Sequence, residues 1–215
     1  ARRTSATAEA VAGAAPDGDA ADRFRRAVAA IDAAHAEDPV TVEVDGAARP
    51  RELVHAEAMT AWVRRLVAEP TEAQLLAARA HHLRRWEVPR ATYPEGRTGY
   101  LRWRRDQQRR HAEELSALLA DTGCDEDTTE RAATIVTKRG LGSDPDVQLF
   151  EDAVALTFLE TQLVSVRTKL DDDAKLVDVL AKTLRKMSSR GRAAAAGIDL
   201  DPQLAELVAA AVAEL

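Results

Sequence analysis

Apolar residues recur every three or four positions along most of this chain, and its Pro and Gly residues fall mostly between the segments with this spacing. Such spacing places apolar side chains on one face of an α-helix. Alanine, a strong helix former, supplies much of the apolar content, whereas aromatic residues make up only 4% of the chain. The sequence therefore predicts an all-α fold, a single-domain bundle of about seven or eight helices over residues 21–215. The expected helices cover residues 21–36, 51–69, 71–87, 99–121, 127–139, 144–169, 171–190 and 202–215.

Local signals refine these boundaries. Thr71 and Gln74 have the spacing of a capping box, which predicts that a helix begins there. Residues 40–46 alternate weakly toward an Asp-Gly pair, which predicts a short extended turn. Residues 1–20 are rich in Ala, Gly, Asp and Thr without periodicity, and we expect them to be disordered.

Charge and cysteine content exclude several protein classes. The formal net charge of −6 argues against general nucleic-acid binding. The single cysteine, Cys124, excludes an intramolecular disulfide and a Cys-rich zinc site. No apolar run approaches the roughly 20 residues needed to cross a bilayer, and residues 1–20 lack the apolar segment of a secretory signal. We therefore expect a cytoplasmic protein with no membrane partner, and nucleic acid is disfavoured as a partner.

Four of the expected helices each turn one possible metal ligand toward the core. On the helical wheel His55, His82, His111 and Asp152 each lie within the apolar stripe of a different helix. His81 lies at the margin of its stripe and is the alternative to His82. Imidazole and carboxylate are the usual ligands of zinc, iron and manganese, and a buried carboxylate requires a cation or hydrogen-bond donors. The pattern predicts a metal site; the alternative is a set of histidines hydrogen-bonded within the core.

The order of these residues resembles a known pattern over roughly residues 53–160. The matching positions are His55 in the segment LVHAE, the His81-His82 pair in ARAHHL, then His111, and Asp152 in EDA. This order resembles the HD-domain metal-dependent phosphohydrolases, and the resemblance implies an HD-like helical bundle holding one or two metal ions. The Asp that follows the second His in that family is absent here. Its absence favours one divalent transition metal ion, namely zinc, manganese or iron.

Further motifs are HLRRWEVPR at residues 82–90 and GYLRWR at 99–104, with shorter ones at 30–34, 36–39, 93–94 and 151–152. In these motifs the chain resembles a family of unassigned function, domain of unknown function 4202. This second resemblance spans most of residues 24–190. It implies a shared fold and brings no activity with it.

A basic segment adjoins the expected site. Ten arginines lie between residues 79 and 110 against three acidic residues, and aromatic residues are interleaved with them. Arginine binds phosphate bidentately and aromatic rings stack on bases, so we expect Arg79, Arg104, Trp86 and Arg90 to bind a small anionic substrate. The alternatives are solvated helix faces or, less favoured, an RNA-binding surface.

These observations lead to a first hypothesis, a metal-dependent hydrolase acting on a small phosphorylated or nucleotide-like substrate. Glu160, two turns beyond Asp152, is the candidate general base or an acceptor for a ligand histidine, and the alternative is a salt bridge to a buried arginine. Lys138 lies where some HD proteins carry another histidine, and with Arg79 and Arg104 it would hold the anion and stabilise charge in the transition state. Glu151 is expected to face solvent. The alternatives are an HD-like iron oxygenase and a non-catalytic helical binding protein with an arginine-rich partner surface.

Overall fold

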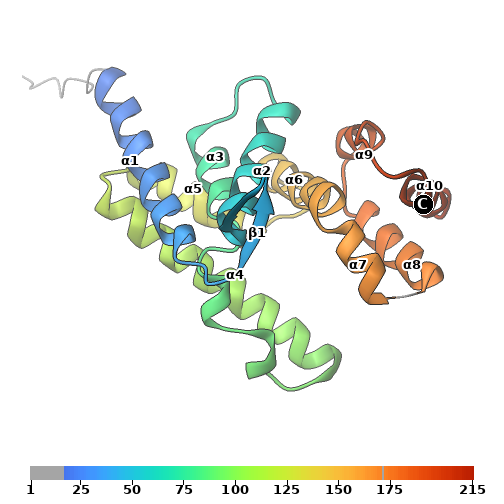
Figure 1. The fold of residues 1–215 in the computed structure, drawn as a ribbon. Coiled ribbons are helices and arrows are strands. Elements are labelled where there is room, and N and C mark those ends of the chain that lie inside the picture. Colours follow the sequence, from blue (N-terminus) through green and yellow to red (C-terminus); the bar gives the residue numbers. More distant parts are fainter. Residues whose placement is uncertain (1–16, 171) are drawn as a thin grey trace, which may run out of the picture.

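The computed structural model describes residues 17–170 and 172–215, which form ten α-helices and a two-stranded sheet (Figure 1). The all-α prediction is confirmed, although the helices are more numerous than expected. The elements are α1 (Asp17–Ala36), β1 (Thr41–Val44), β2 (Ala47–Pro50), α2 (Arg51–Leu66), α3 (Glu72–Arg79), the 3-10 turns η1 (Arg85–Glu87) and η2 (Arg90–Thr92), α4 (Gly96–Asp121), α5 (Glu126–Val136), α6 (Pro145–Thr161), α7 (Leu163–Leu170), α8 (Asp173–Leu184), α9 (Ser189–Ala195) and α10 (Pro202–Ala213). Of the segment expected to be disordered, residues 1–16 lie outside the described residues, and residues 17–20 begin α1.

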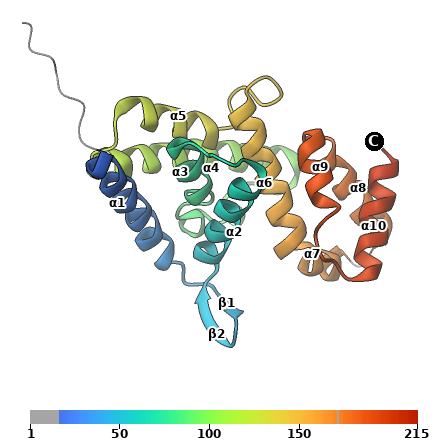
Figure 2. The same ribbon diagram turned by 90° about the horizontal axis from the view of Figure 1, so that it is seen from above.

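The expected extended turn is a β-hairpin that projects from the helices (Figure 2). Asp45 and Gly46 both have positive φ, 51° and 77°, which is the conformation that a tight two-residue hairpin turn requires. Behind the hairpin, the buried carboxylate of Asp38 accepts hydrogen bonds from the backbone N–H groups of Val40 (2.9 Å) and Glu52 (3.0 Å). These bonds fix the first turn of α2, which carries Glu52 and His55.

A continuous apolar core runs from α1 to α10 and contains the apolar stripes predicted from the sequence. Met59, Leu76, Leu115 and Leu156 are fully buried in it, one from each of α2, α3, α4 and α6. Helix α6 lies between the N-terminal helices and the group α7–α10 (Figure 2). In the part of the chain that the structure describes, no helix is long and apolar enough to cross a membrane.

Several expected helices are shorter than the sequence indicates; the one expected over residues 171–190 ends at Leu184 as α8. The capping box of Thr71 and Gln74 begins α3 as predicted, but α3 ends at Arg79 instead of continuing to residue 87. The chain then turns tightly, with His82 (φ 68°) and Arg84 (φ 46°) in the left-handed region. For residues other than glycine this backbone conformation costs free energy, so contacts with the surrounding residues must stabilise the turn. The helix expected over residues 144–169 is likewise divided into α6 and α7 at Gln162.

Asp144 stabilises the start of α6 in two ways. Its carboxylate accepts hydrogen bonds from the backbone N–H groups of Asp146 (3.0 Å) and Val147 (3.3 Å), and it binds Arg131 through two bonds of 2.6 and 2.7 Å. The side-chain hydrogen bonds from Arg131, together with these backbone bonds, lower the pKa of Asp144 from 3.8 to about 2.

We expect Asp144→Ala to lower the free energy of unfolding at neutral pH by about 1–2 kcal/mol, because a helix cap and an ion pair are lost. The pKa of Asp144 is depressed in the folded state, so this contribution is full above about pH 4 and is lost as the pH falls toward about 2. Urea denaturation across this pH range measures it. Glu130→Ala, at an exposed position of α5, is the control. If Asp144→Ala lowered the free energy of unfolding by the same amount at neutral pH and at about pH 2, this account would be contradicted.

Candidate metal centre

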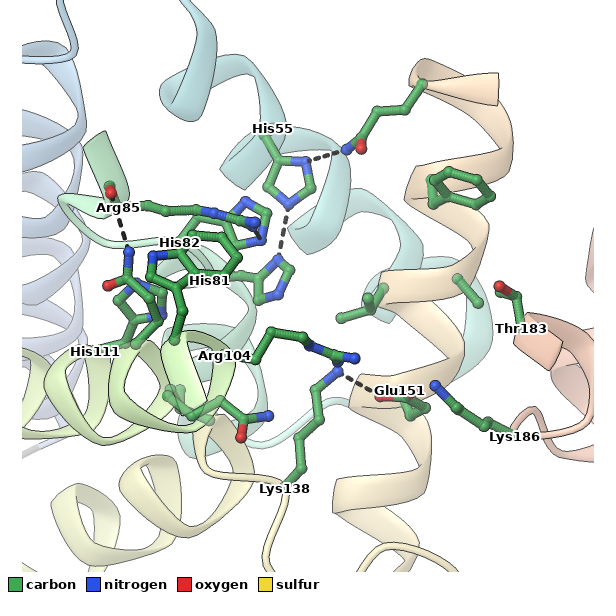
Figure 3. A pocket seen from close by; sticks show the side chains of 18 of the residues that line it. His55, His81, His82, Arg85, Arg104, His111, Lys138, Glu151, Thr183 and Lys186 are labelled. Atoms are coloured by element: carbon green, nitrogen blue, oxygen red, sulfur yellow. Dashed lines mark hydrogen bonds and ion pairs between the residues drawn. The ribbon is translucent and has the colours of Figure 1, made fainter. Parts of the chain in front are cut away.

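Three histidines meet at the junction of α2 and the turn after α3 (Figure 3). His55, His81 and His82 each offer one ring nitrogen, and these nitrogens all lie within 4.8 Å of one another. His55 Nε2 is 2.8 Å from His81 Nδ1, and the ring of His82 stacks on both neighbours. Because the chain turns at residues 80–85, the structure brings His81 and His82 together instead of selecting one. We call these three residues the histidine cluster.

Polar side chains orient two of these rings. The buried carboxylate of Glu52 lies 3.1 Å from His82 Nδ1, and the amide of Gln162 lies 3.4 Å from His55 Nδ1. A His82 Nδ1–H that donates to Glu52 leaves the opposite nitrogen of His82 with a lone pair for a metal ion, whereas the Gln162 amide N–H donates to His55 Nδ1. Arg85 contacts His82 Nε2, so a metal ion bound at that nitrogen would replace this contact.

The histidines of the cluster are uncharged at neutral pH. Burial lowers the pKa of His55 to about 4, and burial and the neighbouring positive groups lower the pKa values of His81 and His82. Metal binding requires neutral imidazole, so no proton has to be displaced at neutral pH. The cluster therefore carries no positive charge of its own at neutral pH.

His111 lies beside the cluster but outside it. Its ring centroid is 6.3 Å from that of His82, and burial lowers its pKa to about 3. Its buried Nε2 has no hydrogen-bond partner among the described residues. Buried polar atoms are rarely left unpaired, and because His111 lines the cavity, this nitrogen is available to a group bound there.

The histidines open into a cavity of about 290 Å³ between α2, α4, α6 and the end of α8. Four cationic side chains line this cavity, and Glu151 is the only carboxylate among the described lining residues. The cations are Arg85, Arg104, Lys138 and Lys186. The cavity is therefore strongly positive in a chain whose net charge is −6, and it suits an anion.

Lys138 and Glu151 form a buried ion pair in the cavity wall, with side chains 12% and 9% exposed. Burial lowers the pKa of Lys138, and Glu151 opposes this effect. Lys138 lines the cavity. The prediction that Glu151 faces solvent is wrong, because α6 is buried on nearly all sides and so has no solvent face at this position.

Asp152 lies outside the cavity and away from the histidine cluster. Its carboxylate accepts hydrogen bonds from the backbone N–H (2.8 Å) and hydroxyl of Ser188 and from Gln148 Nε2 (3.1 Å). It also packs against Gly191, where an added Cβ would lie 2.5 Å from its Cγ. The buried carboxylate is satisfied by these donors, so it anchors α9 instead of binding a metal ion.

Four other expected site residues also lie outside the residues lining the cavity. Glu160 accepts from Trp62 Nε1 (2.8 Å) and Arg65 (3.2 Å) near the surface. Arg79 binds Asp32 bidentately, at 2.5 and 2.8 Å. Arg90 donates to backbone carbonyls of the loop before α4, and Trp86 lies in η1. The structure brings none of these four to the histidines, whereas Arg104 lines the cavity as expected.

Several residues in or beside the cavity were not predicted from the sequence. Arg85 belongs to the basic segment, but its position facing the cavity depends on the turn that ends α3, with its guanidinium 4.7 Å from the ring centroid of Trp103. Glu52 and Gln162 are recognisable only through their contacts with the histidines. Lys186 follows α8, far along the chain, and no local pattern distinguishes it.

Comparison with known proteins identifies the family. The model of a domain of unknown function, DUF4202, matches residues 25–208, which include every residue lining the cavity. No curated protein and no solved structure matches the chain. The extent of the match, which covers most of the chain, shows that this protein belongs to the DUF4202 family.

Proposed function

We propose that this protein is a metal-dependent hydrolase acting on a small phosphorylated substrate. The observation that carries the proposal is the histidine cluster, which opens into a cavity with four cationic side chains and one carboxylate. Neutral imidazoles provide metal ligands, and the cations provide counter-charges for phosphate. The order of the histidines, which resembles that of HD-domain phosphohydrolases, supports the same activity.

His55, His81 and His82 would hold one zinc, manganese or iron ion. Three imidazoles fit such an ion and leave coordination positions for water and substrate. His111, with its unpaired Nε2, lies close enough to contact a group bound in the cavity. A divalent ion supplies a Lewis acid and lowers the pKa of a bound water.

The cavity side chains have distinct parts in this proposal. Arg85, beside His82, would bind the phosphate at the histidine end and stabilise charge in the transition state. Glu160 lies near the surface, which removes it as the candidate general base, and Glu151 is the only carboxylate among the described residues that line the cavity. Lys138 forms an ion pair with Glu151 in the cavity wall.

The test is a hydrolysis assay with protein loaded separately with zinc, manganese or iron, on a panel of phosphomonoesters and nucleotides. We expect turnover with one metal, and Arg85→Met should lower kcat/KM by about 100-fold because it removes a charged donor. Arg105→Met, at an exposed position of α4, is the matched control.

Absence of turnover across the panel by the metal-loaded protein would contradict the proposal. Oxygen consumption by the iron-loaded protein would favour the iron oxygenase instead. A chain that binds no metal would favour the non-catalytic binding protein.

A further inference from the structure

A second group of cations lies at the end of the cavity away from the histidine cluster. Arg104 comes from α4, Lys138 from the turn after α5 and Lys186 from the turn after α8. Figure 3 shows the three side chains gathered around Glu151 of α6. We call Arg104, Lys138 and Lys186 the cation triad.

The triad carries more positive charge than its surroundings balance. Glu151 pairs with Lys138, which leaves the charges of Arg104 and Lys186. Both of these charges act on Lys138 and, with burial, lower its pKa. Among the described residues, neither the Arg104 guanidinium nor the Lys186 ammonium donates a hydrogen bond or forms an ion pair. Lys186 is exposed to solvent, and an anion bound among the three side chains would offset the repulsion between them.

The triad is separate from the histidine cluster but near it. Phe150 borders both, with its ring centroid 5.4 Å from that of His81 and 5.6 Å from Lys138 Nζ. None of the triad contacts a ring nitrogen of the three histidines in the described structure. One small molecule with anionic groups at both ends can therefore reach both places within the 290 Å³ cavity.

We infer that Arg104, Lys138 and Lys186 form an anion site that binds a phosphate group other than the one at the histidines, so that the substrate carries two phosphate groups. Ammonium and guanidinium donors from three directions match a tetrahedral dianion. The anion site itself stands on the triad alone. Its assignment to the substrate of a hydrolase rests on the proposed function.

The anion site is tested first in protein stripped of metal with a chelator, by calorimetric titration of inorganic phosphate. Lys186→Met and Arg104→Met should each weaken phosphate binding by about 10-fold, because each removes a charged donor. The matched controls Lys169→Met and Arg105→Met, at exposed positions of α7 and α4, should leave it unchanged. The inference is overturned if the metal-free parent binds no phosphate, or if Lys186→Met and Arg104→Met bind it as the parent does.

The two-phosphate substrate is tested in metal-loaded protein with a bisphosphonate whose two groups are joined by a three-carbon linker, compared with propylphosphonate. The bisphosphonate should bind at least about 10-fold more tightly, and Lys186→Met should remove this preference. Equal affinity for both compounds overturns the assignment of two phosphates. Failure of metal loading instead counts against the proposed hydrolase and leaves the phosphate titration of the metal-free protein as an independent result.

Discussion

His81→Ala is expected to abolish stoichiometric metal binding. The parent should hold one ion per chain, and loss of His81 removes a ring whose Nδ1 lies 2.8 Å from His55 Nε2 and which stacks on His82. Loss of a residue that merely orients a ligand costs about 10–100-fold in metal affinity, so loss of a ligand should cost at least about 100-fold. Elemental analysis and calorimetric titration measure the change.

His35→Gln is the control for this experiment. His35 is also a buried histidine, but its Nε2 bonds the backbone carbonyl of Arg79 and it lies outside the cluster. This variant should retain the ion. A folded His81→Ala protein that keeps one equivalent of metal would remove His81 from the ligand set.

Asp152→Ala is expected to lower the free energy of unfolding by about 3 kcal/mol while leaving the metal content unchanged. The substitution leaves the buried backbone N–H of Ser188 without its acceptor and frees the start of α9. Gly191→Ala should also destabilise the protein, because the new Cβ would lie 2.5 Å from Asp152 Cγ. Thermal and urea denaturation, with elemental analysis of the same samples, provide the measurements.

Asp152→Asn is the matched variant. Its amide oxygen still accepts from Ser188, so the loss of stability should be smaller than for alanine. An amide is a poorer metal ligand than a carboxylate, so loss of metal from a stable Asp152→Asn protein would return Asp152 to the metal site.

The local sequence was sufficient for much of the fold. The apolar stripes of α2, α3, α4 and α6 become the core, the Thr71 capping box begins α3, and the Asp-Gly pair forms the hairpin turn. These features depend on neighbouring residues, whose spacing and turn preferences are written in the chain itself. The inward placement of His55 and His111 followed from the same periodicity, and both line the cavity.

The helical wheel assumes a regular helix with one buried face. It placed site residues wrongly where the helix ended early or was buried on both faces. It extended α3 through His82, whereas the left-handed turn after Arg79 brings His81 and His82 to the same place. It assigned Asp152 to the site and Glu151 to solvent, although α6 is buried on both sides, with Glu151 in the cavity and Asp152 at α9.

Long-range pairing determined the remaining placements. Arg79 binds Asp32, which lies 47 residues earlier, and its guanidinium is thereby engaged away from the cavity. Lys186 reaches the cation triad only because the chain at the end of α8 lines the same cavity as α6. Periodicity tells which side of a helix is apolar, but the partner of a charged group depends on which distant segments lie beside it. For that reason the helices and two of the site histidines followed from the sequence, whereas the composition of the charged cavity emerged only when the helices were packed together.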